Sequence, residues 1–353
     1  MSRIDYDTIK EKFKSYIQMW NTDWNAYDVE PLKKIFDPDV FFSTSTSLTM
    51  PNGAQDSIYG VYDFLKYFPR TDILQRSIYN YVCRICKDEA YLYAEIPCTA
   101  FNLNDQLDFY EFTAMVTCTW KKLTDGWKIV DMRHEIVGER GTLKSYFEKF
   151  WHFEKEDNFG HHAGESGTMF LSSGTNTDFS RLPVIRGEGD SPWLNVPEAE
   201  NILTEEEKIK EALTKYFFGE EHNSFVHCYE ALSKDYGAYS YFGTDGHTRK
   251  DTVNNLSAAR QTKKYVITPV KYNSIEIKEN RAYVLAQRVR GLRQNSREYV
   301  YTKENMDIEH TCARLELELV KENGDWKLAF LKSYKGLYEG KKWDSEDLYG
   351  DEC

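Results

Sequence analysis

Apolar residues recur at helical spacing in the segments that open the two halves of the chain. Between Ile9 and Trp24, apolar side chains three and four positions apart form one stripe, which predicts an amphipathic helix. A matching stripe from Ile209 to Phe217 follows the sequence Thr-Glu-Glu-Glu at 204–207, which is typical of a helix N-terminus. Each half of the chain is therefore expected to begin with a helix that buries one face.

The pattern changes to long strands after two shorter helical segments. Short helices are expected at 30–36 and 61–68, with a strand at 40–45 between them. Helices followed by an antiparallel meander predict an α+β fold, in which the helices cover one face of a curved sheet. Runs rich in β-branched and aromatic residues predict four long strands, at about 76–86, 89–101, 107–123 and 127–137, with the last hairpin turn at 125–126.

Three segments of the first half return in the second half in the same order, which indicates an internal repeat. The pairs are 9–16 with 209–216, 88–95 with 280–287, and 120–129 with 319–328. We therefore expect two tandem domains of one fold, at 1–153 and 202–340. A connector rich in Gly, Ser and Thr is expected at 154–201, and an acidic tail at 341–353.

Composition argues against several classes of protein. The chain of 353 residues carries 45 Lys and Arg against 57 Asp and Glu, and its net charge of −12 argues against binding to nucleic acid or to an anionic membrane. No apolar run approaches the ~20 residues that span a bilayer. The first residues lack the apolar core of a secretory signal. Seven cysteines at wide spacing fit reduced thiols, so a cytoplasmic protein is expected.

Signals for a metal or a cofactor are weak. Cys83 and Cys86 have the spacing of a zinc or redox pair, but they lie on a predicted strand, where residues three apart point to opposite faces. We therefore expect no metal and no cofactor. The aromatic content of 15% has two interpretations: large side chains that fill the space between sheet and helices, or the lining of a cavity for a flat apolar molecule.

The segment from Trp20 to Phe41 resembles the helix–turn–helix–strand opening of the SnoaL-like branch of the nuclear transport factor 2-like superfamily. The ending at 125–129, Asp-Gly-Trp-Lys-Ile, resembles the last hairpin of that branch, and 324–328 repeats it in the second copy. The resemblance implies cone-shaped domains with a pocket at the wide end, and acid–base chemistry by Asp, His and Tyr without a metal or an organic cofactor. The chain departs from the family at 75–80, Gln-Arg-Ser-Ile-Tyr-Asn, where dehydratase-like members carry a histidine.

Strand parity selects Asp108 and His134 as the candidate catalytic pair. Along 107–122 the even positions are apolar except Asp108, which is either a pocket carboxylate or part of a hairpin beyond the sheet. On the last strand His134 is the polar member of an apolar face, so it is either a core residue or a catalytic base. A short turn at 124–126 would place His134 opposite Val116, on the half of the sheet that carries Asp108.

These residues suggest proton abstraction beside a carbonyl group. Asp108 would orient the imidazole of His134, and Tyr110 or Tyr27 would donate a hydrogen bond to the developing oxyanion. Tyr27 and Asp28 have an alternative role as caps of the helix expected near residue 30. The expected ligand-binding residues are Trp20, Tyr27, Asp28, Tyr62 and Phe112.

The second copy is expected to be degenerate or structural, because Ser333 occupies the position that matches His134. Its sheet carries basic residues whose parity would put them on one face, either as an anion-binding surface or as a solvated face with ion pairs to Glu316 and Glu318. The basic residues are Arg288, Arg290, His310 and Arg314.

Two hypotheses of function follow. The first is a cofactor-free acid–base enzyme, a dehydratase, isomerase or cyclase, that acts on a hydrophobic, cyclic small molecule in the pocket of the first domain. The alternative is a non-catalytic small-molecule-binding protein, or an interaction module whose cavities are filled by side chains. The outer sheet faces of the two domains are expected to pack together as an intrachain pseudo-dimer, and a higher oligomer is left open.

Overall fold

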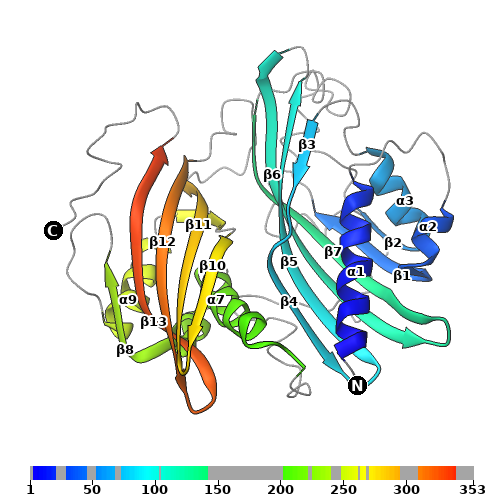
Figure 1. Ribbon diagram of the computed structural model, residues 1–353. Coiled ribbons are helices and arrows are strands. Elements are labelled where there is room, and N and C mark those ends of the chain that lie inside the picture. The colour runs from blue at the N-terminus through cyan, green and yellow to red at the C-terminus, as the bar shows by residue number, and fades with distance from the viewer. Residues whose placement is uncertain are drawn as a thin grey trace.

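The computed structural model contains two units of the same construction, side by side (Figure 1). It describes residues 3–20, 29–45, 53–67, 73–102, 105–141, 202–221, 225–239, 248–260, 263–267, 270–294 and 309–338. In each unit helices lie against one face of a curved, mostly antiparallel sheet, which confirms the expected α+β fold of two tandem cones. The predicted boundaries at 153 and 340, the connector and the tail lie outside the described residues and stay predictions.

The first unit has a seven-stranded sheet in the order β2-β1-β7-β6-β5-β3, with β4 also paired to β5. Every strand pair in it is antiparallel except β1 with β7. The strand predicted at about 76–86 corresponds to β4, and β3 is an additional short strand before it. The elements are α1 (Arg3–Met19), α2 (Glu30–Lys33), β1 (Phe36–Ser45), β2 (Gly53–Asp56), α3 (Ile58–Tyr67), β3 (Ile73–Arg76), β4 (Tyr79–Cys86), β5 (Glu89–Asn102), β6 (Asp105–Leu123) and β7 (Gly126–Gly141).

The second unit repeats this plan with a six-stranded sheet in the order β10-β11-β12-β13-β8, with β9 also paired to β11. Again one pair is parallel, β13 with β8, which corresponds to β7 with β1. The elements are α7 (Glu205–Glu221), α8 (Phe225–Ala231), β8 (Leu232–Tyr239), α9 (Arg249–Arg260), β9 (Lys263–Ile267), β10 (Val270–Lys278), β11 (Arg281–Gln294), β12 (Glu309–Glu322) and β13 (Asp325–Tyr338).

One contact explains why the Trp-Lys ending occurs in both copies. In the first unit the indole N–H of Trp127 donates a hydrogen bond to Asp5 at the start of α1, over 2.8 Å. In the second unit the indole of Trp326 donates to Glu205 at the start of α7, over 3.0 Å. A carboxylate in the first turn also suits the positive end of the helix dipole. In each cone a hydrogen bond from a tryptophan indole to a carboxylate therefore links the last hairpin to the first helix.

The first residues of α7 confirm the helix start expected at 204–207. Glu207 N–H donates to Thr204 Oγ1 over 3.2 Å, and Thr204 N–H donates to the Glu207 carboxylate over 3.0 Å. This reciprocal pair is a capping box, which satisfies two backbone donors that a helix N-terminus leaves without partners. In the described part of the chain, no helix is long and apolar enough to cross a membrane.

The two units meet through α7 and β10 of the second unit, both of which contact β4 of the first unit (Figure 1). One face of α7 packs into its own core through Ile209, Leu213 and Phe217. Another face contacts the outer face of the first sheet, where the ring of Phe218 lies edge-on to Tyr93 with centroids 5.4 Å apart. Both of these rings are fully buried.

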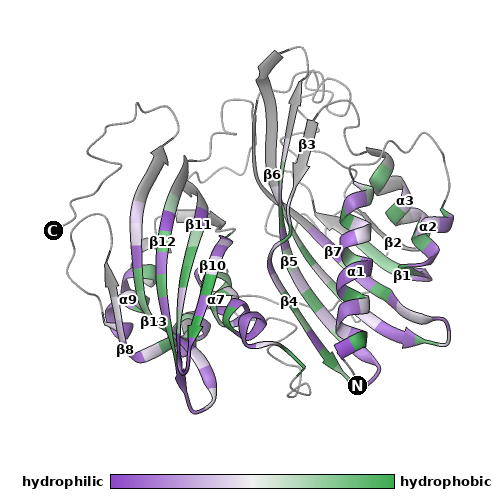
Figure 2. Cartoon of the chain, in the orientation of Figure 1, coloured by the Kyte–Doolittle hydropathy of each residue, from purple (hydrophilic) through white to green (hydrophobic). Residues whose placement is uncertain are grey.

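The expected packing of one outer sheet face on the other is therefore not what the described residues show. On the first sheet, outward-facing Thr117 and Thr119 are buried. At the equivalent positions the second sheet carries Glu316 and Glu318, and its outer face leaves Tyr283 41% exposed. Hydrophilic and hydrophobic residues alternate along β11 and β12 (Figure 2). Burying such charges without full pairing is costly, so one outer face is covered and the other is solvated.

Candidate functional site

His134 lies inside the first cone, as strand parity predicts. It pairs with Val116 across β6 and β7, which confirms the register expected from the hairpin turn. Its Nε2 is 3.1 Å from the Tyr16 hydroxyl, and its ring lies 5.1 Å from that of Trp20 and 5.5 Å from that of Phe42, measured between centroids. The side chain has no exposed surface, and burial lowers its pKa to about 3. His134 is therefore a neutral, tightly packed imidazole at pH 7.

The distance along β6 does not fit a direct pairing of Asp108 with His134. Asp108 precedes Val116 by eight positions on the same strand, which corresponds to about 26 Å of extended chain. Trp20 and Tyr62 belong to the buried core of the first cone, together with the residues that surround His134. The side chains of Asp108, Tyr110 and Phe112, and all of Tyr27 and Asp28, lie outside the described residues. Their roles stay predictions.

The second cone differs from the first at two equivalent interior positions. Glu220 on α7 and Arg288 on β11 form a largely buried ion pair at 3.8 Å, where the first unit has buried Trp20 and Ile96. Ser333 pairs with Leu315 in the register that matches His134 with Val116.

Arg314 lies on the opposite face from Arg288. It stands 3.7 Å from Glu316, with its guanidinium 4.3 Å from the ring centroid of Tyr334. The prediction of a single basic face with Arg288 and Arg314 is therefore wrong. The ion pair with Glu316 fits the alternative of a solvated outer face.

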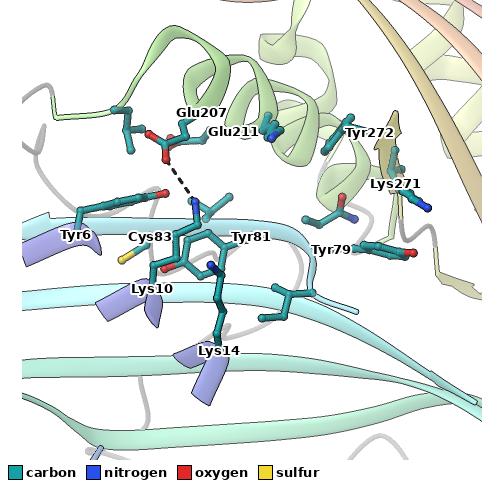
Figure 3. A pocket seen from close by; sticks show the side chains of 16 residues that line it. Tyr6, Lys10, Lys14, Tyr79, Tyr81, Cys83, Glu207, Glu211, Lys271 and Tyr272 are labelled. Carbon is teal, nitrogen blue, oxygen red and sulfur yellow. Dashed lines mark hydrogen bonds and ion pairs between the residues drawn. The ribbon is translucent and has the colours of Figure 1, made fainter. Parts of the chain in front are cut away.

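A cavity of about 290 Å³ lies between the two units (Figure 3). Four elements form it: α1 and β4 of the first unit, and α7 and β10 of the second. Four tyrosines give it aromatic walls, namely Tyr6, Tyr79, Tyr81 and Tyr272. Ligand sites occur preferentially at such domain junctions. Sequence reasoning missed this cavity because it looked for a pocket only inside each cone.

The charged side chains that line the cavity are four lysines and two glutamates: Lys10, Lys14, Lys210, Lys271, Glu207 and Glu211. Both glutamates bind an arginine of the first unit. Arg3 donates to Glu207 over 2.9 Å, and Arg84 donates to Glu211 over 2.8 Å. Burial alone would raise the pKa of Glu207, but hydrogen bonds from Arg3 and Thr204 and the charge of Lys10 lower it to about 2. Both side chains thus link the second unit to an arginine of the first unit.

The floor of the cavity contains a buried polar pair. Asn80 lines the cavity with a backbone φ of 48°, a left-handed conformation that asparagine tolerates better than most residues. Its side-chain amide donates to Glu95 over 2.7 Å, and the hydroxyl of Tyr93 donates to the other oxygen of that carboxylate over 2.8 Å. Glu95 is 1% exposed. These bonds fix the shape of β4 beside the cavity.

The groups around the cavity suit binding better than bond-breaking chemistry. Burial raises the pKa of the Cys83 thiol to about 12, so the thiolate that a nucleophile requires is scarce at pH 7. No histidine is among the described residues that line the cavity. In the described part of the chain, no cluster of three His, Cys, Asp or Glu side chains could hold a metal ion.

No family model matches the chain, and no curated protein is similar to it in sequence. Solved structures are similar to it in fold. A putative scytalone dehydratase from Novosphingobium aromaticivorans is 15% identical, with 40% of this chain and 89% of that chain covered and a TM-score of 0.34. A hexachlorocyclohexane dehydrochlorinase, LinA-type3, from Novosphingobium barchaimii is 13% identical, with 39% and 92% covered and a TM-score of 0.31. An NTF2-like protein from Cytophaga hutchinsonii is 16% identical, with 37% and 98% covered and a TM-score of 0.28.

Each of these similarities spans most of the other protein but only about the length of one unit of this chain. At such identities and scores the similarity concerns the fold alone. The fold assignment depends on three features of each unit: the strand order, the parallel pairing of the first strand with the last, and the helices on one face of the sheet. By its architecture the chain is a tandem pair of α+β cones.

Proposed function

We propose that the protein binds a small molecule in the cavity between its two units and does not transform it. The observation that carries this proposal is the cavity of about 290 Å³, with tyrosine and lysine side chains from four elements around it. Its volume lies just below the ~300–1,000 Å³ that is usual for ligand pockets. A molecule of one or two rings matches that volume.

The chemical character of the lining supports binding rather than catalysis. The two carboxylates are held in ion pairs by Arg3 and Arg84, and a strongly paired carboxylate is a poor proton acceptor near pH 7. The Cys83 thiol is kept protonated by burial. The remaining side chains offer surfaces and hydrogen bonds, which are what a binding site needs.

The acid–base hypothesis has less support. A dehydratase, isomerase or cyclase in the first cone would use His134, which faces inward and whose Nε2 lies within hydrogen-bond distance of Tyr16. Two of the structurally similar proteins are named as a dehydratase and a dehydrochlorinase. Against it stand the full burial of His134, its low pKa and the separation of Asp108 along β6. A base must reach its substrate.

A fluorescence titration tests the binding proposal. The probe is N-phenyl-1-naphthylamine, an uncharged amine with one phenyl and one naphthyl group, whose emission rises in an apolar site. Ile78 lines the cavity, so Ile78→Trp should fill it and weaken binding by about tenfold or more. Ile4 is 74% exposed and does not line the cavity, so Ile4→Trp is the matched control and should bind as the wild type does. Equal binding by both variants, or no binding by the wild-type protein, would overturn the proposal.

A further inference from the structure

We infer that the ligand of this cavity is a flat aromatic molecule that carries an anionic group, such as a carboxylate, sulfonate or phosphate. This inference rests on the proposed function, because it names the class of ligand for the same site. It draws on two features of the lining: its charge and its aromatic walls.

The cavity is locally cationic in an acidic protein. Its lining has twice as many lysines as glutamates, although the whole chain has a net charge of −12. The arginines that pair with Glu207 and Glu211 do not line the cavity, so they compensate the acids from outside it. The lysine charges are therefore not fully cancelled by the carboxylates of the lining. An anion in the cavity would be attracted to them.

The lysines reach the cavity from both units. Lys10 and Lys14 point from α1 toward α7 (Figure 3), and Lys210 stands on α7 itself. Lys14 and Lys210 also contact Glu11 and Glu206, one turn away on their own helices. Such exposed pairs within one helix are worth only about 0.3–0.5 kcal/mol. A ligand anion that is partly shielded from water competes with them effectively.

The aromatic walls favour a flat ligand. Lys10 Nζ lies 5.6 Å from the ring centroid of Tyr6 and 5.7 Å from that of Tyr81, so the charge is held against two aromatic faces. A ring in the cavity would stack against tyrosine while its anionic group reached the lysine. Lys10 is 3.4 Å from Glu207, a distance long enough for the ammonium to take a second partner.

A matched pair of probes isolates the contribution of charge. 8-Anilinonaphthalene-1-sulfonate is N-phenyl-1-naphthylamine with one sulfonate added, so both probes have the same rings. The wild-type protein should bind the sulfonate about tenfold more tightly than the amine, and the difference should shrink as salt is added. Lys10→Met keeps the apolar stem of the side chain. It should weaken sulfonate binding about five- to tenfold and leave amine binding unchanged, which also shows that the variant is folded.

Lys34→Met is the control, because Lys34 is exposed on the first unit and does not line the cavity. It should leave the affinity for both probes unchanged. Equal affinity for the two probes, with both blocked by Ile78→Trp, would overturn the anionic class while the binding site stands. Equal loss of both probes in Lys10→Met would also overturn it. If Ile78→Trp blocked neither probe, the proposed function itself would fail.

Discussion

His134 should make the stability of the first cone depend on pH in a way that its burial dictates. In the unfolded chain a histidine has a pKa near 6.5, whereas in the folded protein burial lowers the pKa of His134 to about 3. Between these values only the unfolded state binds the proton. Stability is therefore complete above about pH 6.5 and is lost as the pH falls toward 3.

The size of the effect follows from the two pKa values. Each pH unit below 6.5 costs about 1.36 kcal/mol of unfolding free energy until the folded state is protonated as well. At pH 5 the loss due to His134 is about 2 kcal/mol, and below pH 3 it approaches about 5 kcal/mol. The rings of Trp20 and Phe42, with centroids 5.1 Å and 5.5 Å from that of His134, pack against the imidazole and contribute to the burial that lowers its pKa.

The assay compares urea unfolding of the wild-type protein and His134→Gln at pH 7.5 and pH 5. Glutamine does not titrate, and its side-chain oxygen can accept the hydrogen bond of the Tyr16 hydroxyl, now 3.1 Å from Nε2. The other seven histidines are common to both proteins, so their effects cancel. The wild type should lose about 2 kcal/mol more than the variant.

Parallel pH profiles would refute this reasoning. They would mean that His134 titrates near 6.5 in the folded protein and therefore contacts water. The first cone would then be open to solvent, and the acid–base hypothesis would regain its base.

Three further predictions concern the contact between the units. Phe218→Ala removes a fully buried ring that packs on Tyr93, and it should lower the unfolding free energy by about 3–5 kcal/mol in urea titrations; a loss below about 1 kcal/mol would contradict the packing. Asn80→Ala and Asn80→Gly both lose the hydrogen bond to Glu95, but alanine also strains the left-handed backbone, so it should be the less stable variant by about 1 kcal/mol; equal thermal stabilities would exclude that strain. Because the pKa of Glu207 is lowered to about 2, the stabilisation from its ion pair with Arg3 is fully present above about pH 4.5 and is lost as the pH falls toward 2. Glu207→Gln removes this ion pair at pH 7 as well, so the two units should separate further and the radius of gyration in solution scattering should increase. An unchanged radius would count against this role of Glu207.

Much of the fold followed from local patterns. The helical stripes predicted α1 and α7, and the glycine turns fixed the last hairpin, with Gly126 at a φ of 110° and Gly324 at 93°. Counting from the pair Leu123–Gly126 would place Arg133 opposite Val116, and a register shift between Thr119 and Trp120 brings His134 there instead. Position within an antiparallel hairpin is set by local geometry, which a single sequence contains.

The way in which the surfaces of the two units pack on each other could not be predicted from local sequence patterns. Alternation along a strand predicts that Tyr93 and Thr117 face away from the helices, but it does not say whether water or another unit covers them. Only a comparison of the two copies indicates that the outer face of the first sheet is covered, because the second sheet has Glu316 where the first has Thr117. The cavity between α1, β4, α7 and β10 depends on how the units dock, and no periodicity within either unit determines that. How near the side chains of Asp108 and His134 come to each other depends on the course of the 19-residue strand β6, which strand parity does not describe.

The burial of α7 on two sides has a consequence for synthesis of the protein. A ribosome makes the chain from its N-terminus, so β7, the last described strand of the first cone, which ends at Gly141, is made before α7, which begins at Glu205. At ~5–20 residues per second, translation of the intervening chain takes about 3–13 s. Throughout that interval the face around Tyr93 lacks the helix whose Phe218 packs on it in the finished protein. The nascent first cone is thus the species most prone to aggregate, and its exposure lasts until the next cone supplies a helix.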